Sequence, residues 1–308
     1  MKTYREMAHD IMKERTSKDT KREKLLKIGL TETDIQQLFF IERMAARQGQ
    51  KEAAADKARR QLLASYTFGV EIECCNVRPD TIGTIANRKG LDFRNETYNH
   101  TDHRSHYKLV PDSSIRGSDP IECVSPILKN GKPGFDSLKA CCDTLNEAGA
   151  RVNRSTGLHV HVGGQITEQQ YCNVFVNYYY LEAIIDTFMP QSRRNGNCYC
   201  KTLHGNIDEG HLNAARSYSQ IESAFHCDRY YKVNATAWRR HHTIEFRQHQ
   251  GSTNYDKIAA WARFCIKLVH WSADNRLTAP VASINDIEFL TDEEKAYFTN
   301  RANALAAL

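Results

Sequence analysis

The sequence has no run of about 18 apolar residues, the length that a membrane-spanning helix requires, and we expect no membrane contact. Its first residues, Met1 to Glu6, reach charged side chains at once, which predicts that no secretory signal is present. It also lacks internal repeats and low-complexity linkers. The ten cysteines are scattered and include two vicinal pairs, a usage typical of reduced thiols rather than of a disulfide framework. These absences predict a globular cytoplasmic protein.

The net positive charge of the chain comes from its N-terminal segment. Residues 1–64 hold 15 of the 42 Lys and Arg residues and 10 of the 37 acidic residues, so they account for the whole net charge of +5. A basic arm can bind nucleic acid or an acidic partner. Here the signs are interleaved, as in Lys21-Arg22-Glu23-Lys24, which is more typical of a solvated helical face. We therefore expect no nucleic-acid partner and keep this segment as a candidate element for binding a protein or for self-association.

Three regions differ in pattern. Residues 1–64 predict a charged, mainly helical extension, in which Gly29 is a stop signal for a first helix and Thr31 offers an N-cap for a second. Residues 65–280 alternate short β-type runs with helical stripes and form the main domain. Residues 281–308 predict a helical C-terminal tail.

The main domain contains six runs that predict strands. They are Thr67–Cys74, Tyr107–Pro111, Pro120–Val124, Leu158–Gly163, Tyr230–Ala235 and Thr243–His249. Helical stripes between and after these runs include those around Phe135, Tyr171 and Trp261. This order predicts an α+β fold with a mostly antiparallel sheet and helices packed on one face.

Four of the predicted strands carry polar residues in alternation with apolar ones. Three of them hold a polar pair two residues apart: Glu71 with Glu73, His159 with His161, and Glu245 with Arg247. Residues two apart in a strand point to the same face, so each pair shares a face and apolar residues occupy the other. A fourth run adds Glu122 between two apolar neighbours. One such strand is most often an exposed amphipathic strand, but four with one pattern predict a polar cleft over the sheet.

The polar residues of these strands suit metal-assisted phosphoryl transfer. Carboxylates side by side raise each other's pKa, and a divalent cation would compensate them. Carboxylates suit Mg²⁺ or Mn²⁺, and imidazole favours metals that also accept nitrogen, including Mn²⁺. Arg247 beside Glu245 would be a fixed cation directed at a phosphate. The alternatives are a metal hydrolase built on the histidine pair or, for each pair alone, a surface strand or a cross-strand salt bridge.

A separate zinc candidate consists of Cys198, Cys200, His204 and His211. It lacks the two-pair spacing of a structural zinc site. Zinc binding by these four residues therefore stays an open alternative to ordinary core and surface roles.

Taken together, the strand motifs resemble the amidoligase family, which are carboxylate–amine ligases with a glutamine-synthetase-like fold. The resemblance runs from about Tyr66 to Asp274 and leaves out residues 1–64. No P-loop or glycine-rich phosphate motif is present, as the resemblance implies. The segments that carry it are Phe68–Glu73, Asp112–Ile115, Ile121–Leu128, Thr156–Gly163, Arg193–Asn195 and Thr243–Ser252.

The resemblance implies roles for individual residues. Two or three Mg²⁺ or Mn²⁺ ions would be held by Glu71, Glu73, Glu122, His159 and Glu245. His161 and Arg247 would contact ATP. Further phosphate candidates, with less defined spacing, are Arg193, Arg194 and Arg216.

The reaction that the resemblance implies is ATP-dependent carboxylate–amine ligation. ATP would phosphorylate a carboxylate, and an amine would then displace phosphate from the acyl phosphate to leave an amide or isopeptide bond. Arg247 would stabilise the transition state, and Asp112 is a candidate base for the amine proton. The expected partners are small-molecule or peptide carboxylates and amines. The alternatives are a phosphotransferase on the same type of fold, and a non-enzymatic assembly or binding protein that uses residues 1–64.

Substrate pockets in such ligases are built from loops. Here we expect them at Asn76–Ser105, Ser192–Gly210 and Ser272–Asp286. Candidates to face a carboxylate substrate, or else ordinary surface residues, are Tyr98, His100, His103 and Arg104.

Overall fold

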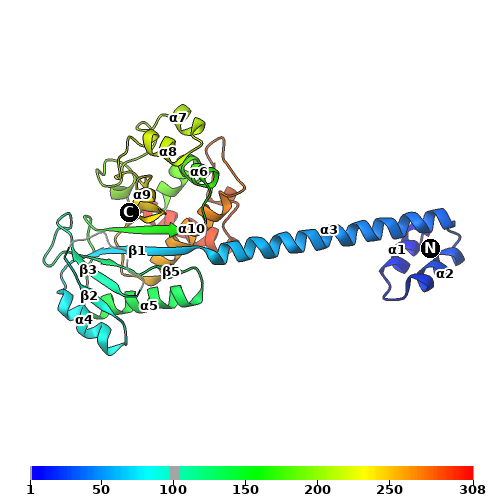
Figure 1. Cartoon of the computed structure of the whole chain (residues 1–308), viewed down its shortest axis with the longest axis horizontal. Helices are drawn as coiled ribbons and strands as arrows, with labels where there is room; N and C mark the ends of the chain where they lie inside the picture. Colours follow the sequence, from blue (N-terminus) through cyan, green and yellow to red (C-terminus); the bar gives the residue numbers. More distant parts are fainter. Residues whose placement is uncertain (1, 98–104, 308) are drawn as a thin grey trace. The chain divides into compact units, whose positions relative to one another are not determined.

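The computed structural model describes residues 2–97 and 105–307 and divides into two compact units, Met1–Gln61 (unit 1) and Leu62–Leu308 (unit 2). Helices and strands carry the labels of Figure 1. No helix in the described ranges combines the length and the apolar character that crossing a membrane requires. The four candidate substrate residues between 98 and 104 lie outside the described residues.

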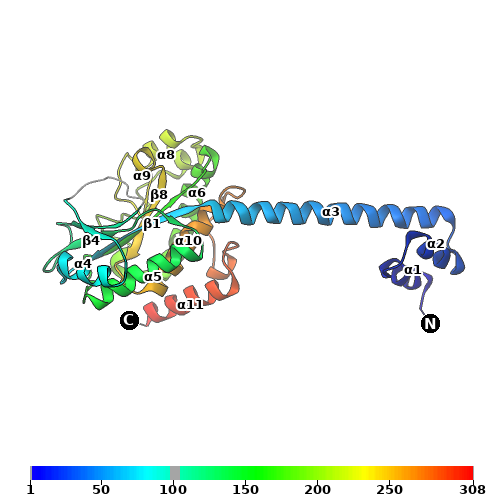
Figure 2. The same cartoon turned by 60° about the horizontal axis from the view of Figure 1, so that its bottom comes forward.

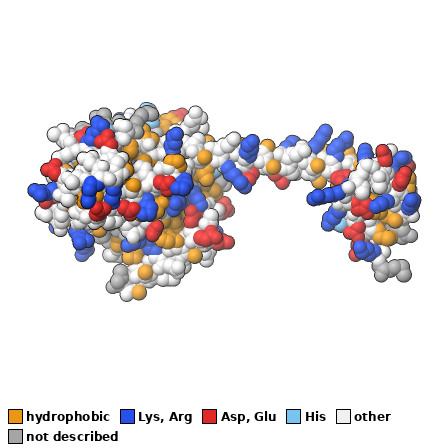
Figure 3. All heavy atoms as spheres, turned by 90° about the horizontal axis from the view of Figure 1, so that it is seen from below, with side chains coloured by type: hydrophobic (Ala, Val, Ile, Leu, Met, Phe, Trp, Pro, Cys, Tyr) orange, Lys and Arg blue, Asp and Glu red, His pale blue; other side chains and the backbone are white. Residues whose placement is uncertain are grey.

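Unit 1 is a small helical assembly. It contains α1 (Tyr4–Lys13), α2 (Lys18–Lys27) and most of α3 (Glu32–Ser65). One apolar residue from each helix, Ala8, Leu25 and Ile35, is buried in a common core. On the face drawn in Figure 3, Lys and Arg side chains of unit 1 are interspersed with Asp and Glu. This mixture agrees with the interleaved charges of the sequence.

The first predicted helix, which was expected to run to Gly29, is two helices. The chain is extended at Glu14, and the Ser17 side chain accepts a hydrogen bond from the Thr20 N–H to cap α2. Gly29 follows α2 with a φ of +90°, a conformation that favours glycine. After it, the expected second helix and the alanine-rich stretch form one 34-residue helix, α3.

Unit 2 is built on one eight-stranded sheet. Its strands are β1 (Thr67–Cys74), β2 (Phe93–Asn95), β3 (Tyr107–Pro111), β4 (Ile121–Val124), β5 (Leu128–Lys129), β6 (Gly157–Gly163), β7 (Val233–Asn234) and β8 (Thr243–Gln250). The order is β2-β3-β4-β1-β6-β8-β7, and β5 pairs with β1. Of the described strand pairs, only β2 with β3 is parallel, so the sheet is mostly antiparallel as predicted.

Helices cover one face of this sheet. The helical elements of unit 2 are α4 (Pro79–Arg88), α5 (Lys132–Glu147), α6 (Glu168–Thr187), η1 (Gln191–Arg193), α7 (Glu209–Ala214), α8 (Tyr218–Ala224), α9 (Ala237–His241), α10 (Tyr255–Trp271), η2 (Ile284–Asp286) and α11 (Asp292–Ala306). Figure 2 shows α5 and α10 running beneath the strands. Phe68 of β1 stacks on Phe135 of α5, with ring centroids 4.8 Å apart. Tyr178 of α6 lies against Phe246 of β8 at 5.7 Å. The fold is therefore α+β, with a layer of helices on one face of the sheet.

The alternation of the strands decides which residues face these helices. In β1, Phe68, Val70 and Ile72 are buried in the core, so Glu71 and Glu73 point to the opposite face. Burial of large apolar side chains stabilises by roughly 1.5–3 kcal/mol each, which holds the strand in this orientation. A slip of one residue would bury the carboxylates against the helices. The packing of the apolar face thus positions the polar face.

Two predicted elements differ in extent. The run Tyr230–Ala235 forms a strand only at Val233–Asn234. Before it, the Lys232 carbonyl still accepts the Arg247 N–H of β8, but the Lys232 N–H donates to the Lys201 carbonyl outside the sheet. At the C-terminus, α11 packs onto unit 2 through Phe298, whose ring contacts Phe188 at 4.6 Å. The short strands β2 and β5 carry too few residues for an alternation to reveal them.

Candidate functional site

A cleft of about 2000 Å³ lies over the polar face of the sheet. Its floor is formed by residues of β1, β3, β4, β6 and β8, and loops and α9 form its walls. Among its lining residues are all five predicted carboxylates and both histidines of the strand pairs: Glu71, Glu73, Asp112, Glu122, Glu245, His159 and His161. The cleft that the strand patterns predict is therefore present.

The strand register brings the polar residues face to face. Glu73 pairs with Glu122 across β1 and β4, and Glu71 pairs with His159 across β1 and β6. His161 pairs with Glu245 across β6 and β8. Residues directly opposite in an antiparallel pair share a face, with Cβ atoms roughly 5 Å apart. Four strands thus deliver their polar side chains to one patch.

His159 lies at the centre of this patch. Its Nδ1 lies 2.8 Å from Glu71 Oε2, and its Nε2 lies 3.4 Å from Glu73 Oε1. Nδ1 is also 3.7 Å from Glu245 Oε1 and 4.0 Å from Glu122 Oε1. The ring is thus surrounded by carboxylates from three neighbouring strands.

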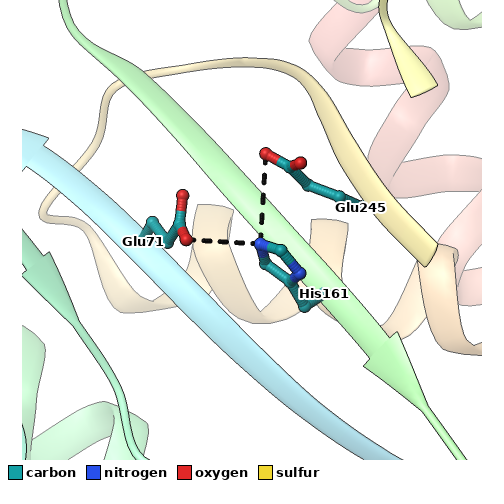
Figure 4. A group of neighbouring side chains, drawn as sticks. All are labelled: Glu71, His161 and Glu245. Atoms are coloured by element: carbon teal, nitrogen blue, oxygen red, sulfur yellow. Dashed lines mark ion pairs between the residues drawn. The ribbon is translucent and has the colours of Figure 1, made fainter. Parts of the chain in front are cut away.

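His161 lies one row further along β6. Figure 4 shows the carboxylates of Glu71 and Glu245 directed at the same ring nitrogen from strands on either side. That nitrogen, Nε2, is 3.3 Å from Glu71 Oε1 and 3.9 Å from Glu245 Oε1, and it has no hydrogen-bond partner in the described part of the chain. Nδ1 lies 2.9 Å from Thr243 Oγ1. Burial lowers the pKa of His161, but the charge and hydrogen bonding of Glu71 together with the charge of Glu245 outweigh burial, and the pKa lies above its ordinary value.

Glu245 is held by two neighbours. The Arg247 guanidinium and the Asn234 side-chain amide both donate to its carboxylate. Burial raises the pKa of Glu245, but the charges of Arg247, His161 and His159 together outweigh burial and lower the pKa to about 2. Arg247 also lies over the Tyr230 ring, 5.7 Å from its centroid. The pair is therefore charged and oriented without any ligand.

The acidic end of the patch contains Glu73, Glu122 and Asp112. Burial raises the pKa of Glu122 well above its ordinary value, and the charges of Glu71 and Glu73 raise it further. Glu73 accepts a hydrogen bond from the Gly157 N–H at 2.6 Å. Asp112 accepts one from the Ser114 N–H at 2.7 Å, which holds the loop after β3 in a turn. Three carboxylates thus gather at this end of the patch.

The patch offers three overlapping sets of metal ligands. Each set places one ligand atom per residue within 4.8 Å of the others: Glu71, His161 and Glu245; Glu71, Glu122 and His159; and Glu73, Asp112 and Glu122. Carboxylate oxygens with at most one imidazole suit Mg²⁺ or Mn²⁺. The buried, unpartnered Nε2 of His161 between two carboxylates fits such an ion. Two members of these sets were not predicted as metal ligands. His161 was predicted to contact ATP, and Asp112 was predicted to act as a base.

The predicted arginines separate in the structure. Arg193 lines the cleft and is buried, with a guanidinium that donates to the Thr156 carbonyl. Arg194 donates to the Met189 carbonyl and Arg216 to the Asn213 carbonyl, and neither is among the residues that line the cleft. The structure therefore brings Arg193 and Arg247 to the site and leaves the other two outside it.

The zinc candidate does not come together in the described ranges. Cys200 is buried and Cys198 is exposed. His204 bonds to the Tyr179 carbonyl, and His211 lies beside Asp208 on the surface. None of the ligand groups found among the described residues contains any of the four.

Several cleft residues have no clear signal in the sequence. Lys108 lies buried on the floor, opposite Val124 of β4, and Asn234 holds Glu245. A single lysine inside the apolar run of β3 was the available signal for Lys108. A register shift, or bulge, in the β6–β8 pairing lies at His159, between Leu158 and Val160. A bulge depends on how two strands pair, so the residue pattern of a single strand does not predict it.

Of the three loops expected to line the cleft, only one does so. Residues 191–193 and 195–199 line the cleft, within or beside the expected loop from Ser192. The described residues of Asn76–Ser105 and the loop Ser272–Asp286 contribute none of the lining. The other wall residues lie within 111–116, 125–127, 153–155, 222–230 and 236–243.

Comparison with known proteins identifies the family of this chain. A family model described as "putative amidoligase enzyme" matches residues 64–269, more than half of the chain, and the chain belongs to this family. No curated protein matches the chain. Among solved structures, a bifunctional glutathione synthetase from Pasteurella multocida is similar at 11% identity and a TM-score of 0.41, over 81% of this chain. The chain spans 42% of that protein's length, and at this score the likeness carries no argument about activity.

Proposed function

We propose that this protein is an ATP- and Mg²⁺- or Mn²⁺-dependent carboxylate–amine ligase. The single observation that carries the proposal is the convergence of five carboxylates and two imidazoles from adjacent strands in the cleft of an amidoligase-family chain. Like-charged side chains in such proximity destabilise a fold unless a cation or a ligand compensates them. The site is therefore built for bound ions and a polyanionic substrate.

The three ligand sets would hold the ions. Bound Mg²⁺ or Mn²⁺ supplies Lewis-acid polarisation of phosphoryl oxygens and shields charge between a carboxylate and ATP. His161 fits this role when its Nδ1–H donates to Thr243 Oγ1, because Nε2 then presents its lone pair to the ion. His159 fits it through either nitrogen, each of which faces a carboxylate.

Arginines would bind the phosphates. Arg247 is fixed by Glu245 and Tyr230, so it enters the reaction already oriented. In the first step a substrate carboxylate oxygen bonds to the γ-phosphorus and the bond to the ADP oxygen breaks. In the second step an amine nitrogen bonds to the acyl carbon and inorganic phosphate leaves. Asp112, at the rim of the acidic end, is the candidate that receives the amine proton.

The test is ADP release from the purified protein with ATP, Mn²⁺ and mixtures of carboxylic acids and amines. We expect release that requires metal, acid and amine together, and product masses equal to acid plus amine minus water. Glu73→Gln removes a ligand while keeping an acceptor for the Gly157 N–H, and it lowers the rate by at least a hundredfold. Glu288→Gln, an exposed position outside the cleft, is the matched control and keeps the rate. An unchanged rate in Glu73→Gln would contradict the proposal.

Other outcomes separate the alternative functions. A stable phosphorylated product formed without an amine identifies a phosphotransferase. Turnover without ATP identifies a hydrolase. Absence of turnover and of ATP binding leaves a non-enzymatic binding protein, for which residues 1–64 are the candidate binding element.

A further inference from the structure

The two ends of the cleft differ in chemistry. The end at the start of β6 is lined by Arg116, Arg154 and Ser155; we call it the Arg154 end. The opposite end, at the close of β6, is lined by Pro126, Ile127 and the histidines of α9 and its C-cap; we call it the Ile127 end. The candidate metal ligands lie between the two ends. Two different ligands can therefore meet over the acidic patch.

Hydrogen bonds between two loops fix the backbone of the Arg154 end. The Arg116 N–H donates to Ser155 Oγ at 2.8 Å, and the Asn153 side chain donates to the Arg116 carbonyl at 2.6 Å. These bonds join the loop after β3 to the loop before β6. Asn153 Oδ1 also accepts from the Ser155 N–H at 2.8 Å, which closes the turn that carries Arg154. The two arginine backbones are thus held side by side.

Both loops are tied to the acidic patch. The turn that leads to Arg116 is capped by Asp112, a member of one ligand set. The turn that carries Arg154 continues to Gly157, whose N–H binds Glu73 of the same set. A group bound by the arginines is therefore at a defined distance from an ion held there.

The guanidinium groups of this end are available to a ligand. Neither Arg116 nor Arg154 makes an ion pair with any described residue, although the acidic patch lies in the same cleft. Arginine binds carboxylate or phosphate through paired N–H donors, and an unpaired arginine in a cleft loses little on exchanging water for such a group. By contrast, Arg239 at the opposite wall is already paired with Glu222 at 2.6 Å.

The Ile127 end suits the nucleotide. Ile127 is 41% exposed, an unusual state for a large apolar side chain, and a flat base can cover it. Gly69 lies on the floor beside it, and an added Cβ there would meet only Ser125 Oγ at 3.6 Å and His161 Cβ at 3.9 Å. The glycine thus leaves room over the strand for a close approach. With ATP at this end, the Arg154 end is left for the acid substrate.

We propose that Arg116 and Arg154 bind a second anionic group of the acid substrate, so that this ligase acts on carboxylic acids that carry a further carboxylate or phosphate. This inference rests on the proposed function, because it assumes that the bound acid is a substrate. The binding itself can be measured without turnover. The acid's reacting carboxylate lies at the acidic patch with the ions, and its second anion lies between the two guanidinium groups.

The experiment measures ligand-dependent thermal unfolding of the full chain with Mn²⁺ and ADP, at constant ionic strength. Two matched pairs are the probes: L-glutamate with L-glutamine, and O-phospho-L-serine with L-serine. We expect the anionic member of at least one pair to bind on the order of tenfold more tightly than its neutral partner. Preference for glutamate identifies a dicarboxylate, and preference for phosphoserine identifies a phosphorylated acid.

The variants are Arg116→Gln, Arg154→Gln and the double change, with Arg151→Gln as the matched control. Arg151 is an exposed arginine of the same loop that does not line the cleft. We expect the double variant to lose the preference, and the control to keep it. All positions are exposed, so unfolding temperatures without ligand stay within a few degrees of the parent.

Three outcomes overturn the inference: no preference in the parent protein for either anionic acid, a preference that survives the double change, or a loss of ADP affinity in its place. The last would assign the arginines to the nucleotide. Failure of the proposed function looks different, since it is the absence of ADP release with every acid and amine. A preserved anion preference in a protein without turnover would leave the binding inference standing alone.

Discussion

Glu73 and Glu122 lie directly opposite each other on β1 and β4, and both side chains point into the same cleft. Both are largely buried, with side-chain exposures of 8% and 13%. Like charges directly opposite on adjacent strands destabilise a sheet. The fold therefore holds a local conflict that a bound cation resolves, as functional sites often do.

Glu122→Gln tests that conflict. In the folded protein Glu122 either stays charged opposite Glu73 or takes up a proton, as its raised pKa indicates. Both cost free energy that Gln avoids, so the metal-free protein becomes more stable by roughly 0.5–1 kcal/mol. The same change removes a ligand, so the rise in unfolding temperature on adding Mn²⁺ becomes smaller. Calorimetry in EDTA and in Mn²⁺ measures both effects. Glu288→Gln, an exposed position, should change neither, and a metal-free Glu122→Gln protein less stable than the parent would contradict the repulsion argument.

Thr243→Val tests how His161 is oriented. Thr243 Oγ1 lies 2.9 Å from His161 Nδ1, and the substitution removes this partner at nearly constant volume. Loss of a group that orients a metal-binding histidine typically weakens metal affinity by ~10–100-fold. Titration with Mn²⁺ followed by electron paramagnetic resonance measures the change. Thr67→Val, a cleft-lining threonine of β1, is the control and should bind Mn²⁺ like the parent.

Substitutions of His159 and His161 should affect the metal and ATP requirements of the reaction differently. The resemblance implies that His159→Ala weakens metal dependence first and that His161→Ala mainly raises the ATP requirement. The position of His161 Nε2 between two carboxylates adds a second expectation, a loss of Mn²⁺ affinity in His161→Ala. Initial rates over a grid of Mn²⁺ and ATP concentrations distinguish these results. A His161→Ala protein with parental affinity for Mn²⁺ leaves His161 as an ATP contact alone.

The buried Lys232 supports the backbone at Arg247, which lines the cleft. Lys232 is fully buried, and its Nζ lies 2.7 Å from Glu182 Oε1 and 2.7 Å from Asp186 Oδ1. Its carbonyl accepts the Arg247 N–H at 2.8 Å. Lys232→Met leaves two acids without their cation and should destabilise by about 3–5 kcal/mol. Denaturant unfolding measures this, and Lys232→Met combined with Glu182→Gln should be more stable than Lys232→Met alone. Simple additivity of two losses would contradict the coupling.

The strand pairs were predictable because their signal is local. An alternation of period two over β1, β6 and β8 places Glu71 with Glu73, His159 with His161, and Glu245 with Arg247, whatever the strands pair with. The register that joins them was not predictable, since β1 and β6 are separated by more than 80 residues and a register depends on the packing of both faces. Which carboxylate faces which imidazole is therefore visible only in the fold.

The arginines show the same limit at close range. Arg193 and Arg194 are neighbours in sequence, yet η1 ends between them and their side chains go to different carbonyls, Thr156 and Met189. No periodicity applies to a three-residue turn, so nothing in the residue pattern distinguishes the two arginines. Lys108 is a parallel case, because a lone charge in an apolar strand indicates burial or an edge equally well.

His249 provides a test by pH at a buried position of β8, outside the candidate metal ligands. It is 3% exposed, its ring lies 5.9 Å from the Trp261 ring, and its Nδ1–H donates to the Gln250 carbonyl at 2.7 Å. Burial is the main cause that lowers the pKa of His249 from an ordinary value of 6.5 to about 3, and the charge of Arg301 contributes to the same shift. The folded state thus keeps this ring neutral at a pH where the unfolded chain protonates it.

The sign of the effect follows from that difference. Between pH 6.5 and about 3 the unfolded state binds one more proton at His249, so the protein loses stability as the pH falls through this window. The contribution is about 1.4 kcal/mol per pH unit and is absent above pH 6.5. His249→Phe keeps the packing on Trp261 and removes the titration. We expect the stability of the variant, measured in EDTA by urea unfolding, to fall less steeply with acid than that of the parent. The carboxylates of the cleft titrate in both proteins and cancel in the difference, so parallel curves would show that His249 is protonated in the folded state.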